Sequence, residues 1–188
     1  MVKEFYIKNM VCDRCIKVLQ NEIKAINVTV LEIELGKLKV DIKNPKDETV
    51  LKSIIFENGF SLVESPEEQL VEQVKIELIR LLKELPLEMP KRLSAHLEDK
   101  LNIEYSKISK VFSYSEEVTI EKYFIKLKIE KVKELIQIKE NNFTEMGHLL
   151  NYSHINHLSS QFKNETGMSL SQYKQQQLNF RTSLDKIV

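Results

Sequence analysis

Apolar residues recur at two different spacings along the first 65 residues, and the shorter of these spacings predicts strands. Aromatic and branched residues over 2–8 predict a first strand. Alternating apolar positions over 28–35 and 38–42 predict two more strands, which a hairpin turn at Gly36-Lys37 would join. The segment 60–63 is predicted to form a last short strand.

Helical spacing separates these predicted strands. Ile16, Leu19 and Ile23 recur every three or four residues and predict a helix that follows a short loop. Asn44-Pro45 and Lys46-Asp47 break the pattern after the third strand. A second helix is predicted over 49–58, where Asn58-Gly59 suits a helix end because glycine accepts the left-handed conformation. The resulting order βαββαβ is that of a ferredoxin-like α+β domain, which we predict over residues 1–65.

A further helix is predicted over residues 66–85. Ser65 is placed to cap it and Pro66 lies in its first turn, followed by acidic residues that face the positive end of the helix dipole. Pro86 and Pro90 are expected to end it. This segment is predicted to be a linker helix or the first helix of a second domain.

Residues 86–188 show helical periodicity throughout and are predicted to form an all-α domain. The long central helix, over 120–138, is amphipathic, and shorter helices flank it on both sides. The predicted helices cover 93–101, 105–112, 120–138, 143–150, 155–163 and 170–177.

Composition and charge limit the function classes. Lys and Arg total 28 and Asp and Glu total 28, so net charge does not by itself indicate a nucleic-acid partner. No segment approaches the roughly 18 uninterrupted apolar residues of a membrane span, and the N-terminus lacks the apolar region of a secretory signal. We therefore expect a cytoplasmic protein without a membrane partner. With four glycines, no glycine-rich phosphate loop and no nucleophile–base set, it is not expected to be an enzyme.

The two cysteines of the chain, Cys12 and Cys15, lie between the first predicted strand and the first predicted helix. Two thiolates at this spacing can converge on one soft cation, and we expect the helix N-terminus to lower the pKa of the thiols. A two-thiolate site suits Cu(I), and suits Zn(II) less because Zn(II) prefers four ligands.

Residues 1–64 resemble the heavy-metal-associated domain of copper chaperones and metal-transporting ATPases. Met10, Cys12 and Cys15 match its M-x-C-x-x-C signature, and Gly59-Phe60 matches the turn before its last strand. The resemblance implies that the two cysteines bind metal and that Met10 supports the loop from beneath. Asp13 and Arg14 depart from the small residues usual between the cysteines. A redox switch and an unused cysteine pair remain alternatives to metal binding.

The segment 143–163 satisfies the requirements of a helix-turn-helix unit: a short helix, a tight turn and a second helix with polar residues on its outward side. Ser153 is the expected N-cap of that second helix. The residues that match a known pattern are Tyr152-Ser153, Leu158 as an apolar position, Gln161-Phe162-Lys163, Gly167-Met168-Ser169 and Tyr173. On these residues the segment resembles the second helix-turn-helix of AraC/XylS-type regulators. The departures in residue type are Asn151 for Gly, Leu158 for an aromatic residue, Leu170 for Pro and Gly147 for Ala.

An earlier segment, 93–123, resembles the first helix-turn-helix of the same family less closely, and the helix that follows it resembles the family's linker helix with Lys128 in place of Arg. Glu116 and Glu117 occupy the turn after its second helix, where Gly is usual, and are expected to face solvent. The resemblance implies DNA contacts by Ser106, Lys107, Ser109, Lys110, His154, Asn156, His157, Ser159, Ser160 and Lys163, with Lys174 a further phosphate-contacting candidate.

The sequence thus predicts a transcription regulator that binds double-stranded DNA, with a possible homodimeric form and a possible response to Cu(I). The DNA-binding domain itself is expected to need no cofactor. The alternative is a soluble metal-binding or trafficking protein whose helical half is a protein-interaction domain.

Overall fold

The computed structural model describes residues 1–176 and 181–187, which form two compact units, Met1–Ile76 and Glu77–Val188. The boundary lies within helix α3 (Pro66–Leu81), inside the segment predicted as a linker helix. Ser65 caps this helix as predicted, because its hydroxyl accepts a hydrogen bond from the backbone N–H of Glu68 at 3.2 Å.

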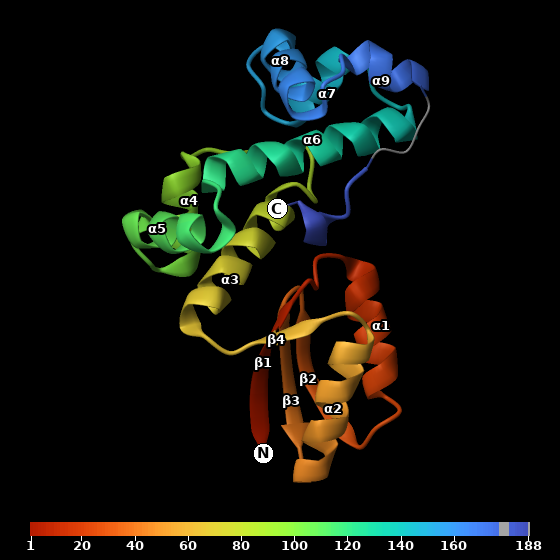
Figure 1. Ribbon diagram of the computed structural model, residues 1–188, viewed down its shortest axis with the longest axis vertical. Helices are drawn as coiled ribbons and strands as arrows, with labels where there is room; N and C mark the ends of the chain where they lie inside the picture. Colours follow the sequence, from red (N-terminus) through yellow and green to blue (C-terminus); the bar gives the residue numbers. More distant parts are fainter. Residues whose placement is uncertain (177–180, 188) are drawn as a thin grey trace. The chain divides into compact units, whose positions relative to one another are not determined.

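The first unit contains a four-stranded antiparallel sheet with strand order β2-β3-β1-β4, so that β3 lies between the two strands that α1 connects. Helices α1 and α2 pack against each other and against the sheet (Figure 1). The predicted order of strands and helices is confirmed. The elements are β1 (Val2–Lys8), α1 (Asp13–Ile23), β2 (Val28–Glu34), β3 (Lys37–Ile42), α2 (Pro45–Glu57) and β4 (Ser61–Val63).

The core of the first unit consists of the apolar residues whose helical and alternating spacings predicted its helices and strands. The helices contribute their inward residues and the strands contribute alternate ones, and the most buried of these are Ile7, Leu19, Ile23, Leu38, Val40, Leu51 and Ile55. The alternation along β2 breaks at Leu31, where the register shifts between Val30 and Glu32 and the Leu31 side chain is exposed. A bulge of this kind inserts one unpaired residue into a strand.

Two boundaries in the first unit differ from the prediction. The hairpin turn is Leu35-Gly36, one residue earlier, because Gly36 supplies the positive φ of +66°. Helix α2 begins at Pro45, four residues earlier than predicted. Asn44 caps it by accepting a hydrogen bond from the N–H of Lys46, so the proline that suggested a break is the first residue of the helix.

The second unit is helical, and all six predicted helices start where the sequence indicated. Helix α6 is long, and α4 and α5 lie at its N-terminal end (Figure 1). Helices α5 and α8 extend beyond their predicted ends, and the predicted final residue of α9, Gln177, lies outside the described residues. The helices are α4 (Leu93–Leu101), α5 (Tyr105–Glu116), α6 (Ile120–Ile138), α7 (Phe143–Leu149), α8 (Ile155–Thr166) and α9 (Leu170–Gln176), followed by the short 3₁₀ helix η1 (Leu184–Lys186).

Helix α3 ends at Leu81 rather than at the predicted Leu85. Its last turn tightens, because the N–H groups of Leu82 and Lys83 donate to carbonyls three residues earlier. Leu85 precedes Pro86, and a residue before proline disfavours the helical conformation. The helix therefore ends before the proline that was expected to end it.

The second unit repeats itself at an offset of 50 residues. Helices α4 and α7 start at 93 and 143, and α5 and α8 span 105–116 and 155–166. The buried residues follow the same offset. Phe112 packs edge-to-face on Tyr123 with ring centroids 5.5 Å apart, and Phe162 packs on Tyr173 at 5.4 Å. The two helix pairs therefore share one packing scheme.

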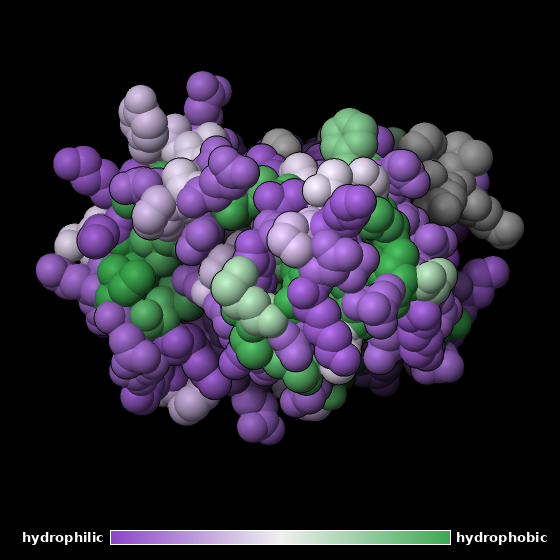
Figure 2. Space-filling model, turned by 90° about the horizontal axis from the view of Figure 1, so that it is seen from below, coloured by the Kyte–Doolittle hydropathy of each residue, from purple (hydrophilic) through white to green (hydrophobic). Residues whose placement is uncertain are grey.

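The exposed surface is mainly hydrophilic on the face that Figure 2 shows, with hydrophobic residues in separate patches. Large apolar side chains that are exposed include Leu31, Phe56, Tyr114 and Ile138, which belong to different elements. Scattered apolar residues of this kind are normal on globular proteins. Among the described residues, no helix combines the length and the apolar character needed to cross a bilayer.

Candidate nucleic-acid interface and cysteine pair

Helix α5 is held against α4 by its inward face and by its first turn. Ile108 and Phe112 are fully buried, and the backbone N–H of Tyr105 donates to the Glu98 carboxylate at 2.7 Å. Asn102 ends α4 in the left-handed conformation, which permits the tight turn between the helices. This packing leaves the opposite side of α5 facing away from the core.

The outward side of α5 carries the four residues predicted to contact DNA in the first helix-turn-helix. Ser106, Lys107 and Lys110 are exposed, and Ser109 is half-buried at the edge of the helix. Tyr114 is 90% exposed and was not predicted. The sequence could have indicated it, because Tyr114 follows Lys107 by seven residues and two residues at this spacing lie on the same side of a helix.

Helix α8 presents the corresponding side of the second predicted helix-turn-helix. Leu158 and Phe162 are fully buried, whereas Asn156, His157, Ser160 and Lys163 are exposed and Ser159 is half-buried. At the offset of 50, the residues 156, 157, 159 and 160 stand where α5 has 106, 107, 109 and 110. The predicted contact residues therefore occupy equivalent places on two equivalent helices.

The turn between α7 and α8 is formed by Asn151, which stands where the family has Gly. Its φ is +58°, and asparagine adopts this left-handed conformation more readily than most residues. Gly147 is buried, but a Cβ atom added there would meet its nearest neighbour, Leu158 Cδ2, at 4.0 Å. The Ala that is usual in the family would therefore fit, so glycine is not required here by a close helix crossing.

Lys128 of α6 fixes this turn. Its Nζ donates to the carbonyl oxygen of Leu150 at 2.8 Å and lies 4.6 Å from the centre of the Tyr152 ring. Burial lowers the pKa of Lys128 from 10.5 to about 8. The Tyr152 hydroxyl donates to Gln161 Oε1 at 2.8 Å, and burial raises the pKa of Tyr152 to about 12. These contacts join α6, the turn and α8.

The N-cap of α8 is His154, and the prediction of Ser153 is wrong by one residue. His154 is exposed, and its side chain makes no capping hydrogen bond with any residue that the structure describes. We expect His154→Ser to raise the free energy of unfolding by about 1 kcal/mol, because serine caps helix N-termini well. Chemical denaturation measures this gain. If His154 contacts DNA, the same variant should bind DNA more weakly, and a gain in both properties would exclude that role.

Glu117 ends α5 with a φ of +54°, at the position where Gly167 ends α8 with a φ of +73°. A left-handed conformation costs a residue with a Cβ roughly 1–2 kcal/mol. We expect Glu117→Gly to raise the free energy of unfolding by about 1 kcal/mol. Asn151→Gly is the matched control, since asparagine tolerates this conformation and the gain should be smaller. Equal effects in urea denaturation would contradict this explanation.

The cysteine pair lies at the start of α1. Cys12 is the N-cap and Cys15 lies in the first turn, and both are half-buried with their Sγ atoms 2.9 Å apart. Met10 is 1% exposed and belongs to the core, which suits a supporting role better than ligation. Asp13 and Arg14 are exposed. Among the described residues, no group of three His, Cys, Asp or Glu side chains is placed to hold a metal ion.

The expectation of a lowered thiol pKa is wrong for Cys15. Burial raises its pKa, and the hydrogen bond and the charge of Cys12 raise it further. Hydrogen bonds from the backbone of Cys12 and Val11 lower the pKa, but each has a smaller effect than burial. Desolvation therefore outweighs the helix N-terminus at this position.

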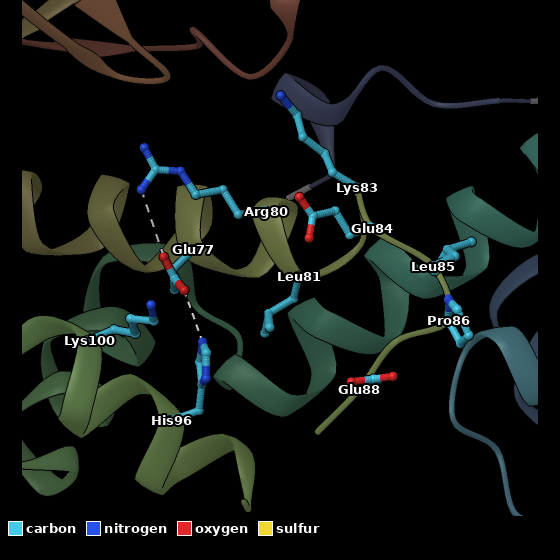
Figure 3. Close-up of a pocket in the computed structure, with 10 residues that line it drawn as sticks. All are labelled: Glu77, Arg80, Leu81, Lys83, Glu84, Leu85, Pro86, Glu88, His96 and Lys100. Carbon is cyan, nitrogen blue, oxygen red and sulfur yellow. Dashed lines mark hydrogen bonds and ion pairs between the residues drawn. The ribbon is translucent and has the colours of Figure 1, made fainter. Parts of the chain in front are cut away.

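A cavity of about 640 Å³ lies in the second unit, between the end of α3, the connecting segment and α4. Glu77 lines it and lies between Arg80 and His96, 2.9 Å from His96 Nε2 and 3.9 Å from Arg80 Nη1 (Figure 3). The remaining lining combines acidic and basic residues with Leu81, Leu85 and Pro86. The Glu77 contacts thus connect the end of α3 to the first helix of the first helix pair.

Comparisons with known proteins give one structural likeness. The C-terminal domain of the two-component response regulator yesN from Fusobacterium nucleatum superposes with a TM-score of 0.47 at 20% sequence identity, over 58% of this chain and 99% of that domain. No family model and no curated protein matches the chain.

Proposed function

We propose that this protein is a transcription regulator of the AraC/XylS type that binds double-stranded DNA through two helix-turn-helix units. The observation that carries the proposal is the repeat at 50 residues. It gives α5 and α8 the same buried anchors and turns short polar and basic residues outward from both. One helix that fits the major groove is the basis of helix-turn-helix recognition.

The exposed side chains of α5 and α8 include groups that can form hydrogen bonds with bases and ion pairs with phosphates. The Asn156 amide can pair with adenine through one donor and one acceptor, and short serines allow the helix to approach base edges closely. Lys107, Lys110 and Lys163 supply positive charge for phosphates, so binding should weaken as salt rises. The exposed Glu104, which precedes α5, opposes phosphate contact at the start of that helix.

Selection from random duplex DNA with the full chain tests this proposal, followed by affinity measurements on the selected sequence. We expect Asn156→Ala to weaken binding by about 1–3 kcal/mol and to relax the base preference at one position. Asn21→Ala, in the exposed face of α1, is the matched control and should leave affinity unchanged. If no sequence is enriched, or both variants behave alike, the proposal fails.

We further propose that the first unit is a ferredoxin-like, heavy-metal-associated-type domain that responds to Cu(I) through Cys12 and Cys15. The donor set supports Cu(I), because the pair has two soft sulfur ligands and Zn(II) would need further ligands. With metal–sulfur bonds of roughly 2.3 Å, sulfur atoms 2.9 Å apart would subtend an acute angle at the ion, so a near-linear Cu(I) site would need them to move apart. Both side chains are half-buried, and binding of the ion would reposition at least one of the thiols.

Titration with Cu(I) tests the metal part separately. The wild type is expected to bind one equivalent, and the Cys12→Ser/Cys15→Ser double variant is expected to bind none at this site. DNA affinity with and without Cu(I) then measures the coupling, which must act equally in both directions. DNA binding that ignores Cu(I) would leave a regulator without metal response, and equal Cu(I) binding by the double variant would exclude the site.

A further inference from the structure

Among the residues that the structure describes, Tyr114 is the most exposed large side chain of apolar character, at 90%. It lies in the last turns of α5, on the helix whose earlier turns carry Lys107 and Lys110. Ordinary packing does not explain it, because the buried residues of this helix are Ile108 and Phe112. An aromatic ring that is left in water exposes apolar area that a contact with a partner would bury.

The spacing places Tyr114 with the basic residues. Lys107, Lys110 and Tyr114 stand at i, i+3 and i+7, so they form one stripe along the side of the helix opposite to the buried residues. Tyr114 thus lies on the same side of α5 as the two lysines, about one turn beyond Lys110. At the offset of 50, the equivalent residue of α8 is Asn164, which is also exposed and also bears a hydrogen-bond donor.

We propose that Tyr114 is a further DNA-contacting residue, whose hydroxyl donates a hydrogen bond to a backbone phosphate while its ring packs against the adjacent sugar. The assignment rests on the proposed function, since it takes DNA to be the partner of this side of α5. A phenol is a neutral donor, so this contact adds affinity without releasing a counterion. The carboxylate of Glu117, which follows shortly after and is exposed, acts against a phosphate nearby.

The test combines affinity with its salt dependence, on a DNA duplex selected with the full-length wild type. Tyr114→Phe should weaken binding roughly three- to tenfold through loss of the hydroxyl donor, and Tyr114→Ala should weaken it more. The slope of log K against log salt should stay unchanged in both. Lys107→Ala should instead reduce the magnitude of that slope by about 1. Phe56→Ala, at an exposed aromatic residue of α2, is the control and should bind as the wild type does.

The possible outcomes separate the proposed DNA-binding function from the assignment of Tyr114. A wild type that enriches no duplex overturns the proposed function and the Tyr114 assignment together. A wild type that binds, with both Tyr114 variants unchanged, overturns only the assignment. Loss in Tyr114→Ala but not in Tyr114→Phe would exclude the phosphate hydrogen bond. Both variants are expected to unfold at the same midpoint temperature as the wild type. A lower midpoint would mean that the loss of affinity comes from a loss of folding stability, which would overturn the assignment.

Discussion

Replacement of Phe162 by alanine should destabilise the second unit by about 3–5 kcal/mol. The Phe162 side chain is fully buried, and its ring packs edge-to-face on Tyr173 with centroids 5.4 Å apart. The loss combines apolar transfer, the cavity left behind and an aromatic pair worth about 0.5–1.5 kcal/mol. Because Phe162 anchors α8, the outward residues of that helix should also lose their fixed position.

Urea denaturation of the full chain, followed by helical circular dichroism, measures this effect. Phe112→Ala is the matched variant, because Phe112 is equally buried and packs on Tyr123 in the same way at the offset of 50 residues. Its loss should be similar in size. Tyr114→Ala, which removes an exposed ring from α5, should change stability by less than about 0.5 kcal/mol. A loss under 1 kcal/mol for Phe162→Ala would contradict the proposed anchoring of α8.

The second large effect concerns pH and Lys128. The pKa of Lys128 is about 8 in the folded protein, whereas the ordinary value of 10.5 applies in the unfolded chain. Between these pH values the unfolded chain binds one proton more than the folded one, so stability rises with pH. A full shift of this size corresponds to about 3 kcal/mol at 1.36 kcal/mol per pKa unit. Below pH 8 the burial of the charged amine opposes folding by the full amount.

The measurement is the free energy of unfolding of wild type minus Lys128→Met, from about pH 7 to pH 10.5. This difference should grow in favour of the wild type across the window, because the variant lacks the titrating group. Lys122→Met removes an exposed amine from the same helix and should show no comparable trend. A wild-type advantage that is flat with pH would mean that the Lys128 amine stays as accessible to water as in the unfolded chain.

The starts of helices were predictable from the sequence because their signals are local. Apolar spacing and residues such as Thr119 and Asn142, which cap α6 and α7 through side-chain hydrogen bonds, mark the first turn. Pro45 was misinterpreted because proline both breaks a helix interior and favours a first turn. The N-cap bond of Asn44 decides between these two readings.

The ends of α5 and α8 were less predictable than their starts, because the buried residues that set the helical spacing stop before the helix does. Phe112 and Phe162 are the last buried residues of these helices, which continue to Glu116 and Thr166. Gly167 marks the end of α8 as the glycine rule expects, but the predicted helix stopped short of it. The ends of α4 and α6 were predicted correctly, although Asn102 and Lys139 rather than glycine adopt the left-handed conformation there.

The predicted interface residues lie on the outward sides of α5 and α8, because periodicity determines which side of a helix is left outside the core. Tyr114 was missed because an aromatic residue in a helix usually indicates a core position. The pKa of Cys15 was misjudged for a different reason. The helix N-terminus is visible in the sequence, whereas the burial that outweighs it depends on the three-dimensional fold.

Footprinting of the full chain on a selected duplex tests the central claim of two DNA-reading units most directly. The wild type should protect one continuous site, Lys107→Ala should weaken protection at one end, and Asn156→Ala should weaken it at the other. The different ends follow from the placement of Lys107 on α5 and Asn156 on α8. A duplex without a protected site, or two variants that lose protection over the same bases, would contradict the claim.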